Sequence, residues 1–332
     1  MKTKLWKTET ILTLLFVTCY LLFVTGCGKK ESPGHIRVVL DWTPNTNHTG
    51  LYVALDKGWF AGEGLTVEIL QPPEDGALVL VGSGNAEFGV DFQETMGTAI
   101  AKDRDALPVT AVAAIISHNT SGIMSLAKNN INSPRDLEGK RFESWEIPVF
   151  TALIQEIVEN DGGKFEDVIM VPNYSTDPLS ALQTDMDAIW VYYAWEGLAA
   201  EVHGLDVNYI DVGSLYPRLD YYTPVLAANT NWLKKNPETA KKFLRAVSRG
   251  YTFAIENPRD AGEILLKCAP ELDRTLVMRS QEYLASCYRQ DAPRWGEIDP
   301  ERWSSFYRWM FECGLLEKDI GSGGFTNEYL PK

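Results

Sequence analysis

Residues 36–54 read IRVVLDWTPNTNHTGLYVA, and this stretch decides the fold class of the chain. Residues 36–40 are apolar except for Arg37 and rich in β-branched side chains, as in a buried strand. A polar loop containing Pro44 follows, and residues 49–57 then have the apolar spacing of a helix that stops at Gly58. A strand that leads through a short loop into a helix is the building unit of a parallel α/β sheet.

Strand and helix patterns keep alternating along the chain. The apolar runs at 109–117 and 122–127 are longer than the others and come where a first lobe would end. The run at 223–228 is also long, and we expect it to return the chain to that lobe. Further strands are expected at 66–70, 88–90, 140–143, 168–171, 188–192 and 207–211, and helices at 75–81, 95–101, 150–160 and 179–183. These patterns predict an α/β fold of two lobes.

The C-terminal part of the chain is helical. A helix follows the start signal Asn236-Pro237-Glu238, and its lysines and arginines fall off an apolar face. That face consists of Ala240, Phe243, Leu244, Val247, Tyr251, Ala254 and Ile255. Further helices near 260–268, 274–288 and 300–313 complete a C-terminal cover.

Domain boundaries follow from the same patterns. We expect 36–119 together with 224–332 to form lobe I, 120–223 to form lobe II, and the turn-rich segment 27–35 to be a tether. The 306 residues after position 26 are more than usually fold around a single hydrophobic core. Two α/β lobes joined by crossover strands leave a ligand cleft at the carboxyl ends of their strands, and they can close on a ligand.

The first 26 residues have the pattern of a secretory signal peptide. Lys2, Lys4 and Lys7 precede an almost uninterrupted apolar run from Ile11 to Val24, and a small residue stands before Cys27. This order resembles the lipobox of bacterial lipoproteins, which implies cleavage before Cys27 and lipidation of that cysteine. The alternative is a signal-anchor helix, but 14 apolar residues are few for a bilayer span. We therefore expect an extracytoplasmic protein that is lipid-anchored to the cell membrane.

Composition excludes several classes of protein. The formal net charge is -14, and it falls to -16 once residues 1–26 are removed. The electrostatic field of this net negative charge opposes binding to nucleic acid or anionic lipid. The four histidines are dispersed, and Cys268, Cys287 and Cys313 are far apart in helical patterns. We interpret these cysteines as buried thiols, and we expect no metal site and no cofactor.

Four segments carry a resemblance to a known family. They are residues 41–54, residues 57–60 (KGWF) with 64–67 (GLTV), residues 81–90 (VGSGNAEFGV) and residues 231–238 (NWLKKNPE). They resemble the periplasmic-type solute-binding proteins of ABC importers, and also the fungal pyrimidine synthase of thiamine biosynthesis, which shares their fold. Within this family the chain is most similar to the type that binds formylaminopyrimidine. The resemblance implies a class II-like two-lobe fold, a monomer, and an ABC permease and ATPase as partners.

The resemblance also indicates what the cleft should contain. An aminopyrimidine is a flat ring with a donor amine and acceptor nitrogens, and it calls for aromatic faces and a carboxylate or amide along its edge. Such side chains lie at or near the ends of the expected strands. The candidate ligand-binding residues are Trp42, Asn45, Asp91, Glu143, Trp145, Tyr192, Tyr193, Trp195, Glu196, Tyr221 and Tyr222.

Each candidate also has a structural interpretation. Trp42 could be a core anchor, Glu196 and Asp91 could cap helices, and Tyr221 and Tyr222 could pack at the hinge. Alternation along a strand cannot place every ring of 192–195 in the cleft, so we expect two of its three aromatic residues to face the ligand. We expect His48 to be structural or to lie at the rim.

Three other functions compete with pyrimidine capture. A fungal-type synthase needs a lysine that binds pyridoxal phosphate and a histidine; aligned on residues 88–90, Asp91 and Thr95 stand at these positions. A carboxylate forms no Schiff base, so we expect no enzyme activity.

Importer subunits for taurine, alkanesulfonates or nitrate bind anions with basic groups. The candidates here are acids and aromatic residues, which favour formylaminopyrimidine or a related thiamine precursor, captured for salvage. A third class, a lipid-anchored adhesion or scaffold protein, would show repeats, and none is found.

Overall fold

The computed structural model describes residues 34–102, 106–144, 147–172 and 177–332. The predicted signal peptide, Cys27 and most of the predicted tether lie outside these residues, as does Trp145. Residues 36–332 form one compact unit. None of the helices in the described residues combines the length and apolar content that crossing a bilayer requires.

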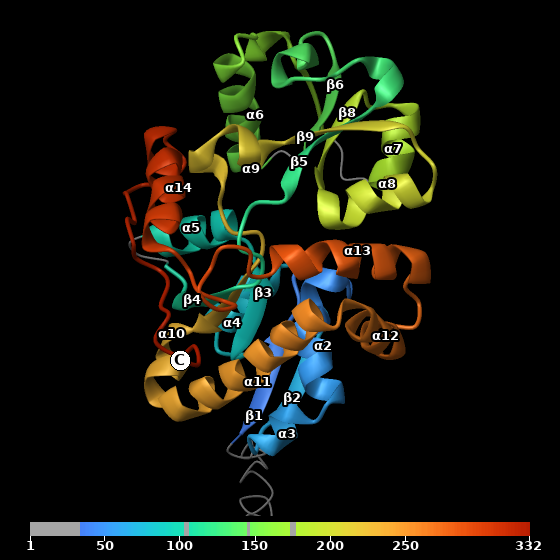
Figure 1. Ribbon diagram of the computed structural model, residues 1–332. Helices are drawn as coiled ribbons and strands as arrows, with labels where there is room; N and C mark the ends of the chain where they lie inside the picture. The colour runs from blue at the N-terminus through green and yellow to red at the C-terminus, as the bar shows by residue number, and fades with distance from the viewer. Residues whose placement is uncertain (1–33, 103–105, 145–146, 173–176) are drawn as a thin grey trace, which may run out of the picture. The chain divides into compact units, whose positions relative to one another are not determined.

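The first sheet has the strand order β2-β1-β3-β10-β4. Its strands are β1 (His35–Val39), β2 (Thr66–Leu70), β3 (Phe88–Asp91), β4 (Val109–Ala114) and β10 (Val225–Asn229). Strands β1 and β3 are parallel, whereas β10 is antiparallel to both of its neighbours, with Val225 opposite Asp91 on β3 and Ala114 on β4. The late strand β10 therefore completes a sheet that the first part of the chain begins (Figure 1).

The second sheet has the order β7-β6-β8-β5-β9. It consists of β5 (Ser121–Leu126), β6 (Arg141–Ser144), β7 (Ile169–Pro172), β8 (Ala188–Tyr192) and β9 (Val207–Asp211). Strand β6 is parallel to β7 and β8, and β5 is antiparallel to β8 and β9. The chain passes between the sheets twice, from β4 to β5 and from β9 to β10.

Helices flank both sheets (Figure 1). Those that follow strands of the first sheet are α2 (Thr49–Asp56), α3 (Trp59–Gly62), α4 (Ala77–Gly82) and α5 (Gln93–Ala101). The second sheet's segment contains α6 (Pro148–Asn160), α7 (Pro178–Thr184), α8 (Leu198–Val202), α9 (Val212–Leu215) and the π-helical turn η5 (Tyr193–Gly197). The C-terminal part contains α10 (Thr230–Lys235), α11 (Pro237–Glu256), α12 (Pro258–Cys268), α13 (Arg274–Cys287) and α14 (Pro300–Glu312). Short 3-10 turns are η1 (Thr46–His48), η2 (Ala127–Asn129), η3 (Pro134–Leu137), η4 (Phe165–Asp167) and η6 (Pro217–Leu219).

Helix α11 buries the apolar face that its sequence predicts. Ala240, Phe243, Leu244, Val247, Tyr251 and Ala254 are all buried, and Ile255 packs at the edge of the same core. This helix lies against α2, and the two backbones meet at Gly50 and Gly250. A Cβ atom at Gly250 would lie closer than 3.0 Å to the carbonyl oxygen of Gly50, so only glycine fits there.

One sequence-based interpretation is wrong. Of the three cysteines after position 27, only Cys287 is buried, whereas Cys268 and Cys313 are exposed. Cys268 is the last residue of α12 and Cys313 follows the last residue of α14, so both thiols stand where a helix ends rather than on its packed face.

Candidate functional site

The loop after β1 holds Asp41, Asn45 and His48 in one hydrogen-bonded unit. Nδ1 of His48 accepts the backbone N–H of Asn45 at 3.2 Å, so this nitrogen carries no proton. The proton of the neutral ring is therefore on Nε2, which lies 2.5 Å from Oδ1 of Asp41 and donates to it. His48 is 0% exposed and holds the Asp41 side chain, which is a structural role.

Asn45 and Trp42 occupy opposite environments in this loop. Asn45 is buried, and its side chain accepts from the backbone N–H of Asn47 and donates to the carbonyl of Thr43. Its polar atoms thus shape the loop. Trp42 is 59% exposed, which leaves its ring face available to a partner.

Asp91 is the last residue of β3, and Phe92 separates it from the first residue of α5. Its carboxylate accepts the backbone N–H of Phe92 at 2.8 Å and the hydroxyl of Thr95. Burial raises the pKa of Asp91 to about 6, and the charge of Asp41 adds to that effect. Asp91 therefore precedes the N-cap residue Phe92, and its carboxylate is held by the turn between β3 and α5.

The two tyrosines at the end of β8, Tyr192 and Tyr193, point in different directions. Tyr192 stacks on Phe92, with ring centroids 5.3 Å apart and planes 18° apart, so the carboxyl ends of β8 and β3 meet here. Tyr193 points elsewhere: its hydroxyl donates to Glu201 at 2.5 Å, and its ring contacts Tyr209 and Tyr283. The alternation expected for this stretch thus separates Tyr192 from Tyr193.

Trp195 and Glu196 belong to the π-helical turn η5. Trp195 is half-buried against the core around α2 and α11. Oε2 of Glu196 accepts the backbone N–H of Tyr192 at 3.0 Å, and burial raises the pKa of this carboxyl to about 6. The side chain therefore orders the turn and stands directly beside Tyr192.

Glu143 is 4% exposed near the end of β6, opposite Val171 of β7. Trp145, two residues later, lies outside the described residues. Glu143 is thus a buried acid at a strand end of the second sheet, as its sequence position predicts.

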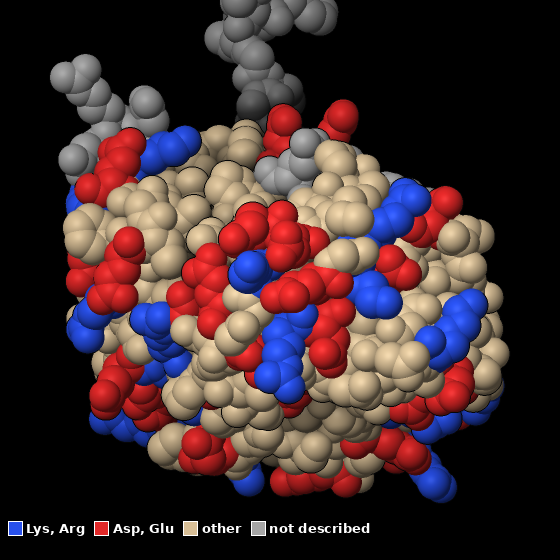
Figure 2. Space-filling model, turned by 90° about the horizontal axis from the view of Figure 1, so that it is seen from above, with Lys and Arg blue, Asp and Glu red and all other residues tan. Residues whose placement is uncertain are grey.

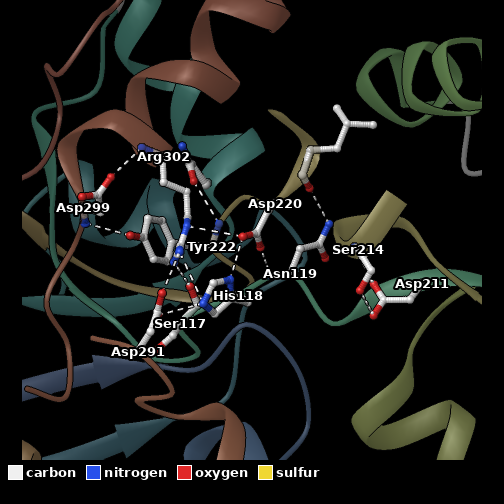
Figure 3. Close-up of polar contacts among 12 residues, drawn as sticks. Ser117, His118, Asn119, Asp211, Ser214, Asp220, Tyr222, Asp291, Asp299 and Arg302 are labelled. Carbon is white, nitrogen blue, oxygen red and sulfur yellow. Dashed lines mark hydrogen bonds and ion pairs between the residues drawn. The ribbon is translucent and has the colours of Figure 1, made fainter. Parts of the chain in front are cut away.

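Tyr221 and Tyr222 pack inside the second crossover. Tyr221 stacks on Phe306 of α14 at a centroid distance of 4.0 Å. The hydroxyl of Tyr222 accepts the backbone N–H of Asp299, and its ring lies 5.5 Å from the guanidinium of Arg302 (Figure 3). Both rings are fully buried, and these contacts are those of hinge packing.

The same view shows an ionic network that joins the two crossovers (Figure 3). His118, in the first crossover, contacts Asp220 of the second crossover through Nδ1 at 2.6 Å and Asp291 through Nε2 at 2.9 Å. Arg302 of α14 adds a contact to Asp220 at 3.4 Å and donates to the carbonyl of Ser117 at 2.5 Å. The hydrogen bond to Asp220 raises the pKa of His118 despite partial burial.

The sequence did not single out Glu94, the second residue of α5. This residue is 2% exposed, and its Oε2 atom has no hydrogen-bond partner in the described part of the chain. Burial raises the pKa of Glu94 to about 8, and the charge of Asp91 contributes. An acid in the first turn of a helix is common for electrostatic reasons, so sequence alone gave no signal.

Asp41, Asp91, Glu94 and Glu196 together form what we call the acid cluster. The pKa of Tyr192 is raised by the charges of three of them, Asp41, Glu94 and Glu196. The charge of the fourth, Asp91, raises the pKa of Glu94. Among the described residues, no lysine or arginine forms an ion pair with any of the four. The cluster thus favours a ligand that is cationic or rich in hydrogen-bond donors and disfavours an anion.

Acidic side chains also gather on one face of the molecule. Figure 2 shows them gathered near the middle of the face viewed from the side of the second sheet, with lysines and arginines scattered among them. No group of His, Cys, Asp and Glu side chains in the described ranges has an arrangement that could hold a metal ion.

The sequence profile of the NMT1/THI5 like family matches residues 45–261. The chain belongs to this family. It is 30% identical to the formylaminopyrimidine-binding protein of Halalkalibacterium halodurans, over 95% of this chain and 96% of that protein. It is 26% identical to a 4-amino-5-hydroxymethyl-2-methylpyrimidine phosphate synthase of Saccharomyces cerevisiae, over 90% of this chain and 88% of that enzyme.

Solved structures confirm the predicted fold class of this family member. The periplasmic aliphatic sulphonate binding protein SsuA of Escherichia coli matches with a TM-score of 0.68 at 16% identity, over 88% of this chain and 96% of that structure. The fold is therefore the two-lobe α/β fold of periplasmic solute-binding proteins, with the class II-like strand order described above. At this identity the match concerns the fold alone.

Proposed function

We propose that this chain is the lipid-anchored, extracytoplasmic solute-binding subunit of an ABC importer, and that it captures formylaminopyrimidine or a related thiamine precursor. The acid cluster carries the proposal, because it joins buried carboxyl groups to aromatic rings where the ends of β3 and β8 meet. The similarity to a formylaminopyrimidine-binding protein, over nearly the whole of both chains, supports it.

The chemistry of the ligand fits these side chains. An aminopyrimidine offers two flat faces for aromatic stacking and an edge of amine donors and nitrogen acceptors. Trp42 supplies an exposed ring, and Glu196 supplies a carboxyl group beside Tyr192. A sulfonate or nitrate would instead enter a field of acids without a paired cation, which would weaken its binding.

We also propose that the protein is not an enzyme, although pyrimidine synthases are among its relatives. The carboxylate of Asp91, aligned with the lysine of the fungal synthases, is hydrogen-bonded to Thr95, which is aligned with their histidine. A carboxylate cannot form the Schiff base that their chemistry needs. In this proposal the protein captures the pyrimidine, its two lobes close on it, and it delivers the ligand to a permease and its ATPase. Cys27 is the site of the lipid anchor.

A ligand screen tests this function. The purified protein without residues 1–26 should be stabilised against heat by formylaminopyrimidine, with quenching of its tryptophan fluorescence, because binding to the folded state raises the melting temperature. Taurine and nitrate at equal concentration are the controls. Tight binding of either anion without any response to aminopyrimidines would contradict the proposal.

Two site variants should weaken binding without unfolding the protein. Trp42→Ala removes a stacking face and Glu196→Gln removes a charged acceptor, and each should raise Kd about tenfold. Isothermal calorimetry measures the affinity, and circular dichroism checks the fold. Phe311→Ala is the matched control, because Phe311 is a 44% exposed ring on α14 outside the acid cluster. Native affinity in both site variants would show that the site lies elsewhere.

A further inference from the structure

Glu94 is a buried acid without an evident structural purpose. Buried polar atoms nearly always have a hydrogen-bond partner, and leaving one without a partner destabilises the folded protein. Oε2 of Glu94 has none among the described residues, although the side chain is almost fully buried. A group kept at this cost is a candidate for contact with a ligand.

In the described part of the chain, the titratable groups coupled to Glu94 come from four elements, and none of these groups is basic. Its charge interacts with Asp91 at the end of β3, Tyr192 at the end of β8, Tyr221 in the second crossover and Tyr307 of α14. Two of these are held by their own contacts, since Tyr307 donates to the carbonyl of Gln93 at 2.9 Å and Tyr192 stacks on Phe92. Glu94 therefore lies near the point where the ends of β3 and β8 meet, and no lysine or arginine among residues 34–102, 106–144, 147–172 and 177–332 forms an ion pair with it.

A carboxyl group in this setting keeps its proton at neutral pH, because burial and Asp91 raise its pKa to about 8. A neutral carboxyl presents an O–H donor beside a carbonyl acceptor. The edge of an aminopyrimidine presents a ring nitrogen acceptor beside an amine donor. The two edges are complementary as a pair of hydrogen bonds, and transfer of the proton to the ring gives a stronger, charge-assisted pair.

We infer that Glu94 recognises the amine and ring-nitrogen edge of the ligand by sharing one proton with it. This inference rests on the proposed function and assigns a specificity-determining residue to that site. The O–H bond of Glu94 is either kept or exchanged for an N–H bond on the ring, so no other reactant is needed.

Sharing one proton fixes how binding depends on pH. At high pH neither Glu94 nor the ring holds a proton, so the complex must take one up, and Kd should rise by up to tenfold per pH unit above about 8. At low pH both hold a proton, so the complex must release one. Asp91 and Glu196, with pKa values of about 6, affect only the acid side of this profile. The alkaline side therefore reports on Glu94.

Calorimetry of the full chain in mild detergent tests the inference, with formylaminopyrimidine as the probe between pH 6 and pH 9.5. Buffers with different ionisation enthalpies should show uptake approaching one proton per ligand above pH 8. Glu94→Gln keeps a donor and an acceptor but cannot titrate, so it should bind within about tenfold of the native protein at pH 7 and lose the alkaline dependence. Glu94→Leu removes both groups and should raise Kd at least tenfold.

Glu63→Gln is the control, because Glu63 pairs with Arg245 outside the acid cluster and should leave the profile native. An unchanged alkaline profile in Glu94→Gln, or native affinity in a folded Glu94→Leu protein, would overturn this inference alone. Failure of the native chain to bind any aminopyrimidine would overturn the proposed function and this inference with it.

Discussion

Replacing Gly250 with valine is expected to lower the free energy of unfolding by about 3 kcal/mol or more. The new Cβ would overlap the backbone carbonyl of Gly50 rather than the flexible end of a side chain, so α2 and α11 would have to separate. Ring packing beside this contact would be lost as well, since Tyr251 stacks on Trp295 at a centroid distance of 4.2 Å. Urea unfolding followed by tryptophan fluorescence measures the loss.

This substitution should also impair ligand binding. Helix α2 begins directly after His48, and the hydroxyl of Tyr251 donates to the carbonyl of Asn47 at 2.6 Å. Movement of α2 therefore carries with it the loop that presents Asp41 and Trp42. Gly62→Ala is the control, because a Cβ there meets nothing within 4 Å and should change stability by less than about 1 kcal/mol. Equal stability of the two variants would contradict the packing argument.

Asp220→Asn should cost about 3 kcal/mol of stability at pH 6 and clearly less at pH 9. At pH 6 the imidazolium of His118 donates to Asp220, and the amide of an asparagine cannot accept every N–H that now points at the carboxylate. At pH 9 a neutral His118 can accept from that amide, so the mismatch is relieved. Urea unfolding of both proteins at the two pH values measures the difference.

The sign of the pH effect follows from the direction of the shift. The pKa of His118 is raised in the folded protein, chiefly by its hydrogen bond to Asp220. Its stabilisation is therefore fully present below about pH 6.5, the value for an unfolded chain, and is lost as the pH rises through the folded-state pKa. Asp291→Asn is the matched control: that side chain is 68% exposed, so its loss should cost less than about 1 kcal/mol. A cost for Asp220→Asn that grows with pH would contradict this account.

The order of strands and helices could be predicted because apolar periodicity is a local property of the sequence. The strands at 66–70, 188–192 and 207–211 have the predicted bounds, and α11 buries the predicted face. The position of β10 between β3 and β4 was not predicted, because pairing between distant segments leaves no local pattern. The exposure of Cys268 was not predicted either, although the end of its helix was, because a helical pattern does not show how the last turn packs.

The candidate site could be predicted only in part. Strand ends pointed to Tyr192 and Glu196, which the structure places side by side. That these two residues bind the ligand stays a prediction. Position in the sequence could not show that the side chain of Asn45 is hydrogen-bonded within its own loop. Nor could it show that Tyr222 is enclosed by α14 and the segment before that helix. Glu94 was missed because burial without a partner is a property of the folded protein.

The placement of β10 has a consequence for how the chain folds during its synthesis. The first sheet cannot be completed until the chain has passed through the whole second sheet, so β3 and β4 must wait with unpaired edges while residues 115–224 are made. Exposed strand edges invite pairing with other chains, and late, non-local pairing is slow. The second sheet, which is contiguous in the sequence, can form first and serve as a finished module around which the split sheet closes last.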